Sequence, residues 1–175
     1  GDTLEAYAKS KFAVETSISG QYLNIASQSD FGFGTDDFSV SCWVYGTSLT
    51  GDRQLWDFRS GTLNEDRIAL WHSATNGLRL YLSGAYITTA TTPLSINTWY
   101  LITVQKRSGI FYIYVNESLV SSIANATTLL DSPLTVGQYS GGGSGWSGYF
   151  DQFVVIKSGG TDIVPALYNS NNGVH

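Results

Sequence analysis

Residues 99–104 have the sequence Trp-Tyr-Leu-Ile-Thr-Val, and residues 111–115 have the sequence Phe-Tyr-Ile-Tyr-Val. Short runs of β-branched and aromatic residues are typical of β-strands. In both runs the two alternating sets of side chains are largely non-polar, although only one face of a sandwich strand enters the core. The second face is therefore either covered by loops or a neighbouring chain, or exposed as a surface on which a flat ligand can stack.

Ten further segments show the same alternation, bounded by Gly, Ser, Asn or Asp. Such short, regularly spaced segments predict an all-β sandwich or barrel. We expect residues 1–175 to form a single two-sheet antiparallel jelly-roll sandwich, with at most one short C-terminal helix over 163–168. The expected strands are Lys11–Glu15, Gln21–Ile25, Phe38–Tyr45, Gln54–Arg59, Arg67–His72, Gly77–Leu82, Ala85–Thr89, Trp99–Arg107, Ile110–Asn116, Leu119–Ile123, Leu134–Gly137 and Tyr149–Lys157.

The composition excludes several classes of protein. Only 13% of the residues are charged and 14% are aromatic, which excludes a disordered chain. The net charge is −5 and the basic residues are scattered, so nucleic-acid binding, which needs a basic face, is not expected. No apolar run approaches the roughly 18 residues of a membrane span. The single cysteine, Cys42, alternates with Val40 and Val44, which indicates a buried structural thiol rather than a nucleophile.

Seven fragments, in order along the chain from about residue 12, resemble one known family. They are Gln21-Tyr-Leu-Asn-Ile25, Phe38-Ser-Val-Ser-Cys-Trp-Val44, Thr98-Trp-Tyr-Leu-Ile-Thr-Val104, Ile113-Tyr-Val-Asn116, Leu134-Thr-Val-Gly137, Gly148-Tyr-Phe-Asp-Gln-Phe-Val154 and Ala166-Leu-Tyr-Asn169. Their order is similar to that of laminin-G-like jelly rolls in the concanavalin A-like lectin and glucanase superfamily. The resemblance implies the fold, which hosts lectins, polysaccharide-binding modules, glycosidases and adhesive domains. One departure is Glu117, where the family usually has a glycine that suits the positive φ of a hairpin turn.

The acidic residues do not form a catalytic pattern. Glycoside hydrolysis needs two carboxyl groups close together, and glucanases of this fold have two glutamates on one strand face. The four glutamates here are at positions 5, 15, 65 and 117, and adjacent Glu65 and Asp66 would point to opposite faces of a strand. His72 is the one histidine before the terminal His175, and no Gly-x-Ser-x-Gly motif for a nucleophile is present. We therefore predict no catalytic residues and no enzymatic activity.

The resemblance implies a structural calcium ion at Asp151. Many jelly rolls of this superfamily hold Ca²⁺ where the last strand meets the N-terminal strand, and Asp151 matches the aspartate of the family's Gly-x-x-Asp motif. Carboxylate and carbonyl oxygens are the ligands that Ca²⁺ prefers. The alternative is that Asp151 caps a turn or pairs with an arginine.

Candidate ligand-binding residues are Tyr139, Trp146, Arg59 and Trp71. Tyr139 and Trp146 flank a glycine-rich loop, and aromatic faces and arginine side chains suit the recognition of sugars. Trp146 matches a family aromatic that often packs inward, so a core position is the alternative. Arg53, Arg59 and Arg67 surround the loop 60–66, and exposed ion pairs are the alternative for all three.

The function expected from these features is non-catalytic carbohydrate binding, with calcium as a stabilising cofactor. The alternative is an adhesion or assembly domain that binds protein partners, because few charges and an aromatic outer face also suit an interface. A polysaccharide hydrolase is disfavoured. The resemblance implies an extracellular or surface-exposed location, on a secreted or virion protein.

Overall fold

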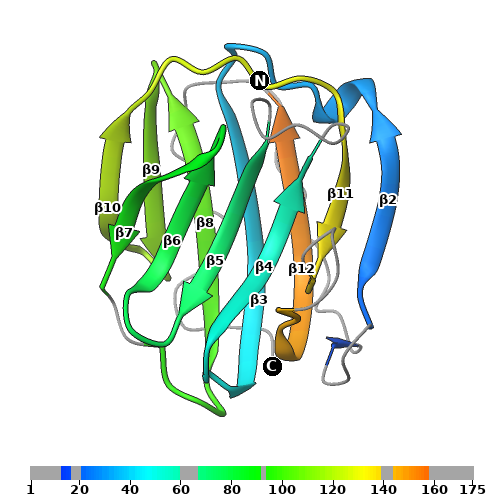
Figure 1. Ribbon diagram of the computed structural model, residues 1–175, viewed down its shortest axis with the longest axis vertical. Helices are drawn as coiled ribbons and strands as arrows, with labels where there is room; N and C mark the ends of the chain where they lie inside the picture. Colours follow the sequence, from blue (N-terminus) through cyan, green and yellow to red (C-terminus); the bar gives the residue numbers. More distant parts are fainter. Residues whose placement is uncertain (1–12, 17–20, 60–66, 92–93, 139–143, 158–175) are drawn as a thin grey trace.

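The structure, a computed structural model, describes residues 13–16, 21–59, 67–91, 94–138 and 144–157. Within these residues, twelve strands form two antiparallel sheets that pack face to face as a sandwich (Figure 1). All twelve expected strands are present, so the predicted fold is confirmed; the helix expected over 163–168 lies outside the described residues. The strands are β1 (Val14–Glu15), β2 (Leu23–Gln28), β3 (Phe38–Ser48), β4 (Asp52–Phe58), β5 (Ile68–Ser73), β6 (Gly77–Leu82), β7 (Ala85–Ala90), β8 (Trp99–Arg107), β9 (Ile110–Val115), β10 (Ser118–Ala124), β11 (Ser132–Val136) and β12 (Ser147–Lys157).

The two sheets are interleaved along the chain. Sheet A has the strand order β1-β12-β3-β8-β9-β10, and sheet B has the order β2-β11-β4-β5-β6-β7. Strands β2 and β11 lie at one side of the sandwich, and β7 and β10 lie at the other (Figure 1). A 3-10 turn, η1 (Ser29–Phe31), follows β2. Within the described ranges, no helix has the length and apolar character that a membrane span requires.

The core lies between the sheets and follows from the alternation in the sequence. Val40, Cys42 and Val44 of β3 are fully buried, and so are Ile102 and Val104 of β8, which pair with them. Burial raises the pKa of the Cys42 thiol, because the thiolate would lose its hydration, so the sulfur stays protonated. The prediction of a buried structural thiol is confirmed.

Four phenylalanines tie the two sheets together at one end of the core. The Phe33 ring, from the segment after η1, stacks on Phe38 of sheet A with the ring centroids 4.1 Å apart. It also contacts the edge of Phe58 from sheet B at 5.3 Å, and Phe38 contacts Phe111 at 6.0 Å. Each such pair adds about 0.5–1.5 kcal/mol to the free energy gained by burial. This cluster therefore fixes the sheets against each other.

The hairpin between β9 and β10 accommodates the residue that departs from the family pattern. Asn116 has φ 56°, whereas Glu117 does not have a positive φ. Asparagine tolerates the left-handed region better than most residues. Of the two central residues of the turn, only Asn116 has a positive φ. The second position, Glu117, therefore does not need a glycine.

His72 should make the fold sensitive to acid. Its side chain is buried on β5, and this burial lowers the pKa of the imidazole, although nearby Asp52 acts in the opposite direction. In the unfolded chain the pKa of this histidine is about 6.5, which is higher than in the folded protein. Protonation therefore favours the unfolded chain, and the free energy of unfolding should fall as the pH drops through that value. Urea denaturation of the wild type and of His72→Gln between pH 7.5 and 5.5 measures this. The loss of stability should be smaller in the variant, and equal losses would contradict the assignment.

Candidate functional site

The outer face of sheet B has a polar cluster that depends on a β-bulge. The register of β4 against β5 shifts between Gln54 and Trp56, so that Leu55 is an extra residue in the pairing. In a regular strand, residues three apart point to opposite faces. Here the bulge puts Gln54 and Asp57 on the same face, opposite Trp71 and Ala69 respectively. Both side chains are almost completely buried.

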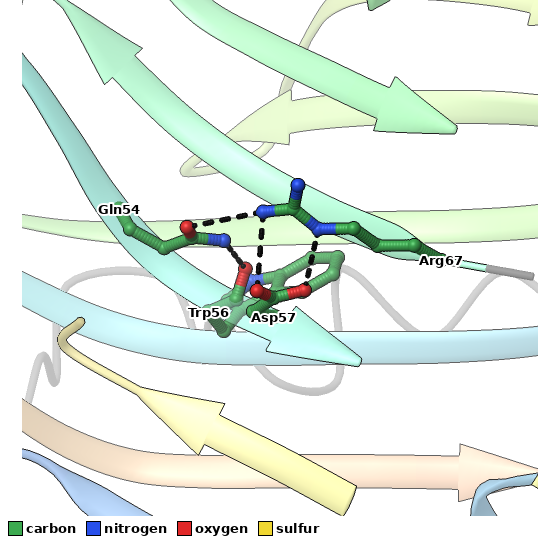
Figure 2. Close-up of polar contacts among 4 residues, drawn as sticks. All are labelled: Gln54, Trp56, Asp57 and Arg67. Carbon is green, nitrogen blue, oxygen red and sulfur yellow. Dashed lines mark hydrogen bonds and ion pairs between the residues drawn. The ribbon is translucent and has the colours of Figure 1, made fainter. Parts of the chain in front are cut away.

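Arg67 joins these two side chains (Figure 2). Its Nε donates to Asp57 Oδ1 at 2.8 Å and its Nη2 donates to Asp57 Oδ2 at 3.1 Å, which is a bidentate pair. Nη2 also lies 3.3 Å from Gln54 Oε1, while Gln54 Nε2 donates to the carbonyl of Trp56 at 2.9 Å. The guanidinium lies over the Tyr81 ring, 4.6 Å from its centroid. Arg67 is therefore part of a buried structural network, and the alternative of an exposed ion pair is wrong for this arginine.

Cationic groups already cover the other aromatic rings of this face. The Arg79 guanidinium lies 3.3 Å from the centroid of the Tyr86 ring and 3.5 Å from Asp52 Oδ2. Tyr81 meets Tyr86 edge to face at 5.2 Å. Trp71, a predicted ligand-binding residue, is buried on this face, with the Arg67 guanidinium 5.7 Å from its ring. Trp71, Tyr81 and Tyr86 thus each contact an arginine of the protein itself.

Trp146, another predicted ligand-binding residue, lies in the core and not with Trp71 on this face. Trp146 is 1% exposed and packs in the core against His72 and Phe150, and its Nε1 donates to the carbonyl of Tyr45 at 3.2 Å. The ligand-binding prediction for Trp146 therefore finds no support in this geometry. Arg59 is half-buried after the end of β4, and its backbone nitrogen donates to the carbonyl of Pro133.

Two further predictions concern Tyr139 and Asp151. Tyr139 lies outside the described residues. Asp151 is partly exposed on β12, the strand that pairs with N-terminal β1, as expected from the family resemblance. Its Oδ1 accepts a hydrogen bond from the Gln152 backbone nitrogen at 2.7 Å.

The outer face of sheet A has an aromatic row that the sequence analysis did not select. Tyr149 of β12 pairs with Tyr45 of β3, which pairs with Trp99 of β8. The centroid of the Tyr45 ring lies 5.8 Å from that of Tyr149 and 5.4 Å from that of Trp99. The interplanar angles of these two pairs are 64° and 51°, respectively. These half-buried rings are tilted against one another, and together with Ala13 they line an open hollow of about 360 Å³. We call this feature the aromatic hollow.

Polar groups border the aromatic hollow at Asn97. The Tyr45 hydroxyl donates to Asn97 Oδ1 at 3.3 Å, and the Asn97 backbone nitrogen donates to the carbonyl of Gly46 at 2.8 Å. Asn97 has φ 58°, which holds its exposed side chain in a tight turn before β8. The Asn97 amide nitrogen and the tyrosine hydroxyls are thus available to bind the polar groups of a ligand. Small-molecule sites commonly combine aromatic walls with a few polar groups in this way, and their volumes begin at about 300 Å³.

The centre of the same face is buried. Trp43, Leu101, Thr103 and Tyr114 are almost fully buried there, and Ser41 Oγ lies 2.8 Å from Thr103 Oγ1. The interpretation that the second face of these strands is covered is therefore confirmed for its centre. The row at the end of the sheet, by contrast, borders open space. The signal for it in the sequence was the aromatic character of outward positions, but the pairing of three distant strands is needed to bring the rings together.

Comparison with known proteins agrees with the fold. A family model described as the concanavalin A-like lectin/glucanases superfamily matches residues 17–158. The chain belongs to this superfamily. No curated protein sequence matches the chain. The likeness to the superfamily therefore rests on the family pattern and on the three-dimensional structure.

Several solved structures share the fold at low sequence identity. The CBM40 domain of the IT-sialidase from Ruminococcus gnavus, bound to α2,3-sialyllactose, is 12% identical, with a TM-score of 0.72 over 90% of this chain and 96% of that chain. Domain 4 of AbnA, a GH43 extracellular arabinanase from Geobacillus stearothermophilus in complex with arabinotriose, is 19% identical, with a TM-score of 0.68 over 90% and 77%. The heptameric SAP-like pentraxin of Limulus polyphemus is 14% identical, with a TM-score of 0.61 over 82% and 74%. This chain is thus similar in fold to whole sugar-bound domains.

The Asp57–Arg67 pair should contribute strongly to stability. Replacing Asp57 with Ala leaves the guanidinium buried without the carboxylate that neutralises it, which typically costs about 3–5 kcal/mol of unfolding free energy. The matched control is Asp52→Ala, which removes the partly exposed partner of Arg79 and should cost under about 1 kcal/mol. Urea denaturation followed by tryptophan fluorescence measures both, and equal effects would contradict a structural role for the buried pair.

Proposed function

We propose that this protein is a non-catalytic carbohydrate-binding module and that the aromatic hollow is its ligand site. The observation that carries the proposal is the juxtaposition of Tyr45, Trp99 and Tyr149 around about 360 Å³ of open space. The C–H groups on one face of a sugar ring are apolar and stack against aromatic rings, while its hydroxyls need hydrogen-bonding partners. Asn97 and the tyrosine hydroxyls provide such partners at the border of the hollow.

The residues that line the aromatic hollow suit the binding of a sugar and not its hydrolysis. The described residues that line the aromatic hollow are three aromatics and Ala13, with no carboxylate among them. A glycosidase needs an acid and a nucleophile or base on either side of the scissile bond. The dispersed glutamates of the sequence also support the absence of hydrolysis.

The structural neighbours support the ligand class and the location. The sialidase domain is bound to a sialylated sugar and the arabinanase domain to an arabinose oligomer, and that arabinanase is described as extracellular. We extend the proposal to an extracellular or surface-exposed location for this chain. Its affinity for a free oligosaccharide should be micromolar to millimolar, because an open hollow buries little ligand surface.

A structural calcium ion at Asp151 is a second part of the proposal. The register of β12 against β3 shifts between Asp151 and Val154, and Gln152, at φ 46°, has no partner in that pairing. A bulge leaves residues of its strand without a partner in the ladder, so backbone carbonyls of this segment together with the second carboxylate oxygen of Asp151 would suit an ion that binds oxygen. The described residues contain no group of three or more His, Cys, Asp or Glu, so carbonyl oxygens would supply most of the six to eight ligands that Ca²⁺ takes.

Truncation of Trp99 tests the ligand site. A glycan array that includes α2,3-sialyllactose and arabinotriose should identify a bound sugar, without release of reducing ends. By isothermal titration calorimetry, Trp99→Ala should then weaken binding by about 1–3 kcal/mol, roughly 5- to 150-fold, because the ligand loses its stacking surface. Tyr112→Ala is the control, since Tyr112 lies on the same face near its opposite end. Equal affinities for the wild type and Trp99→Ala would exclude the hollow, and a lack of any bound glycan would exclude the function.

Chelation tests the calcium ion. A ligand that binds only the folded state stabilises it by about 2.7 kcal/mol at a hundredfold excess over Kd. The melting temperature should therefore be several degrees lower in chelator than in millimolar calcium, and Asp151→Ala should remove that difference. The control variant Asp131→Ala, which removes a different carboxylate, should keep the difference in melting temperature. Identical melting of the wild type in both conditions would disprove the assignment.

A further inference from the structure

The row of rings in the aromatic hollow has a carboxylate beyond each of its two ends. At one end, Tyr149 of β12 pairs with Glu15 of β1, so both side chains lie on the outer face of sheet A. At the other end, Trp99 begins β8, and Glu117 lies in the turn between β9 and β10. Both glutamates are exposed, and neither is among the described residues that line the hollow. Two negative charges therefore flank the hollow without entering it.

A fixed turn determines the position of Glu117. The backbone nitrogen of Leu101 donates to Asn116 Oδ1 at 3.0 Å, and the backbone nitrogen of Asn116 donates to the carbonyl of Leu101 at 2.7 Å. These two hydrogen bonds tie the turn to the first residues of β8. Neighbouring strands lie about 4.8 Å apart. Glu117 is thus held beside the end of β8 at which Trp99 lies.

The basic residues of sheet A lie at its opposite end. Lys157 ends β12 and pairs with Phe38, which pairs with Lys106 of β8, and Arg107 follows Lys106. The stretch of β12 from Tyr149 to Lys157 spans roughly 25 Å, at about 3.3 Å per residue of strand. This is well beyond the screening length of about 8 Å at physiological salt. The lysines and arginines in the described part of sheet A are therefore too far away to pair with an anion in the hollow.

Arg53 of β4 lies at the same end of the sandwich as the hollow, but it belongs to sheet B. It pairs with His72, whose ring contacts Trp146 in the core, so its side chain starts from the inner face of its sheet. Its Nε donates to the carbonyl of Thr50 at 2.8 Å, and its Nη1 donates to the carbonyl of Gly145 at 3.4 Å. Two backbone carbonyls thus already hold this guanidinium.

We propose that the aromatic hollow binds uncharged sugars and discriminates against glycans that carry a carboxylate or sulfate group. This inference rests on the proposed function of the hollow and names its class of ligand. Stacking on the three rings needs only the apolar C–H face of a sugar, and the Asn97 amide and the tyrosine hydroxyls bind hydroxyl groups. An anionic sugar would lose hydration in the hollow and gain no cationic partner among the described residues. The carboxylates of Glu15 and Glu117 would also repel it.

The charge of Asp151 depends on the calcium ion proposed above. Asp151 also lies on the outer face of sheet A, where it pairs with Trp43, but a bound calcium ion would offset its negative charge. Glu15 and Glu117 keep their charges in either case. The preference for uncharged sugars should therefore hold both in calcium and in chelator.

Pairs of sugars that differ by one charged group test the inference. The probes are uncharged oligosaccharides on an array, each beside a derivative with a sialic acid, a uronic acid or a sulfate group; lactose and α2,3-sialyllactose form one such pair. The sugars that bind should be uncharged. In calorimetry at low salt, the charged derivative of a bound sugar should bind about tenfold more weakly or not at all. Added salt should narrow this difference, because it screens the repulsion, and should leave the affinity for the uncharged sugar unchanged.

Charge reversal tests the cause of the discrimination. Glu15→Lys and Glu117→Lys should each raise the affinity for the charged derivative several-fold and keep the affinity for the uncharged sugar. The matched control is Asp30→Lys, which makes the same change at an exposed residue of η1. It lies at the far end of β12, where Lys157 Nζ donates to the carbonyl of Ser29, and should alter neither affinity.

Two results would overturn the inference while the proposed function stands. One is a charged derivative that binds as tightly as its uncharged parent sugar or more tightly. The other is a preference for the uncharged sugar that both Glu15→Lys and Glu117→Lys leave unchanged. A lack of binding by every sugar on the array would instead overturn the proposed function, and this inference with it.

Discussion

Val40, Cys42 and Val44 of β3 are buried between the sheets without any exposed surface, and their burial holds β3 in one register. Side chains alternate between the two faces of a strand, so a shift by one residue would turn these three to the outer face and turn Ser41, Trp43 and Tyr45 toward the space between the sheets. Strand β3 pairs with β12 on one side and β8 on the other, and it therefore sets the register of both neighbours. The row of Tyr149, Tyr45 and Trp99 exists only in this register.

The two outer faces of the sandwich use polar and aromatic groups in opposite ways. On sheet B, the bulge at Leu55 turns Gln54 and Asp57 toward Arg67, and the cost of burying a guanidinium is offset by a carboxylate, an amide oxygen and an aromatic ring. A face on which Arg67 and Arg79 are already paired with carboxylates has little to offer a ligand. On sheet A, the end row leaves tilted rings beside open space, and its polar groups lie at the border. The open hollow beside the rings of sheet A, rather than the composition of the two faces, identifies the site.

Much of the fold was predictable from the sequence, because the alternation of apolar and polar residues directly reflects burial on one face of a strand. The inward position of Cys42 and the outward position of Trp99 both follow from it. The interpretation of Arg67 failed because a bulge leaves no clear mark in the sequence, and without it Gln54 and Asp57 could not share a face. Tyr45 and Tyr149 were not selected, because their proximity depends on pairing between strands about a hundred residues apart. The roles predicted for Tyr139 and for a calcium ion at Asp151 stay predictions.

The claim that sugars bind in the aromatic hollow is tested most directly by the indole N–H signals of the five tryptophans in a two-dimensional NMR titration with a bound glycan. The account predicts that the Trp99 signal shifts progressively with glycan concentration. The signals of Trp56 and Trp146, which are buried in the core, should stay in place. Shifts confined to Trp71, with Trp99 unaffected, would move the ligand to sheet B and contradict the account.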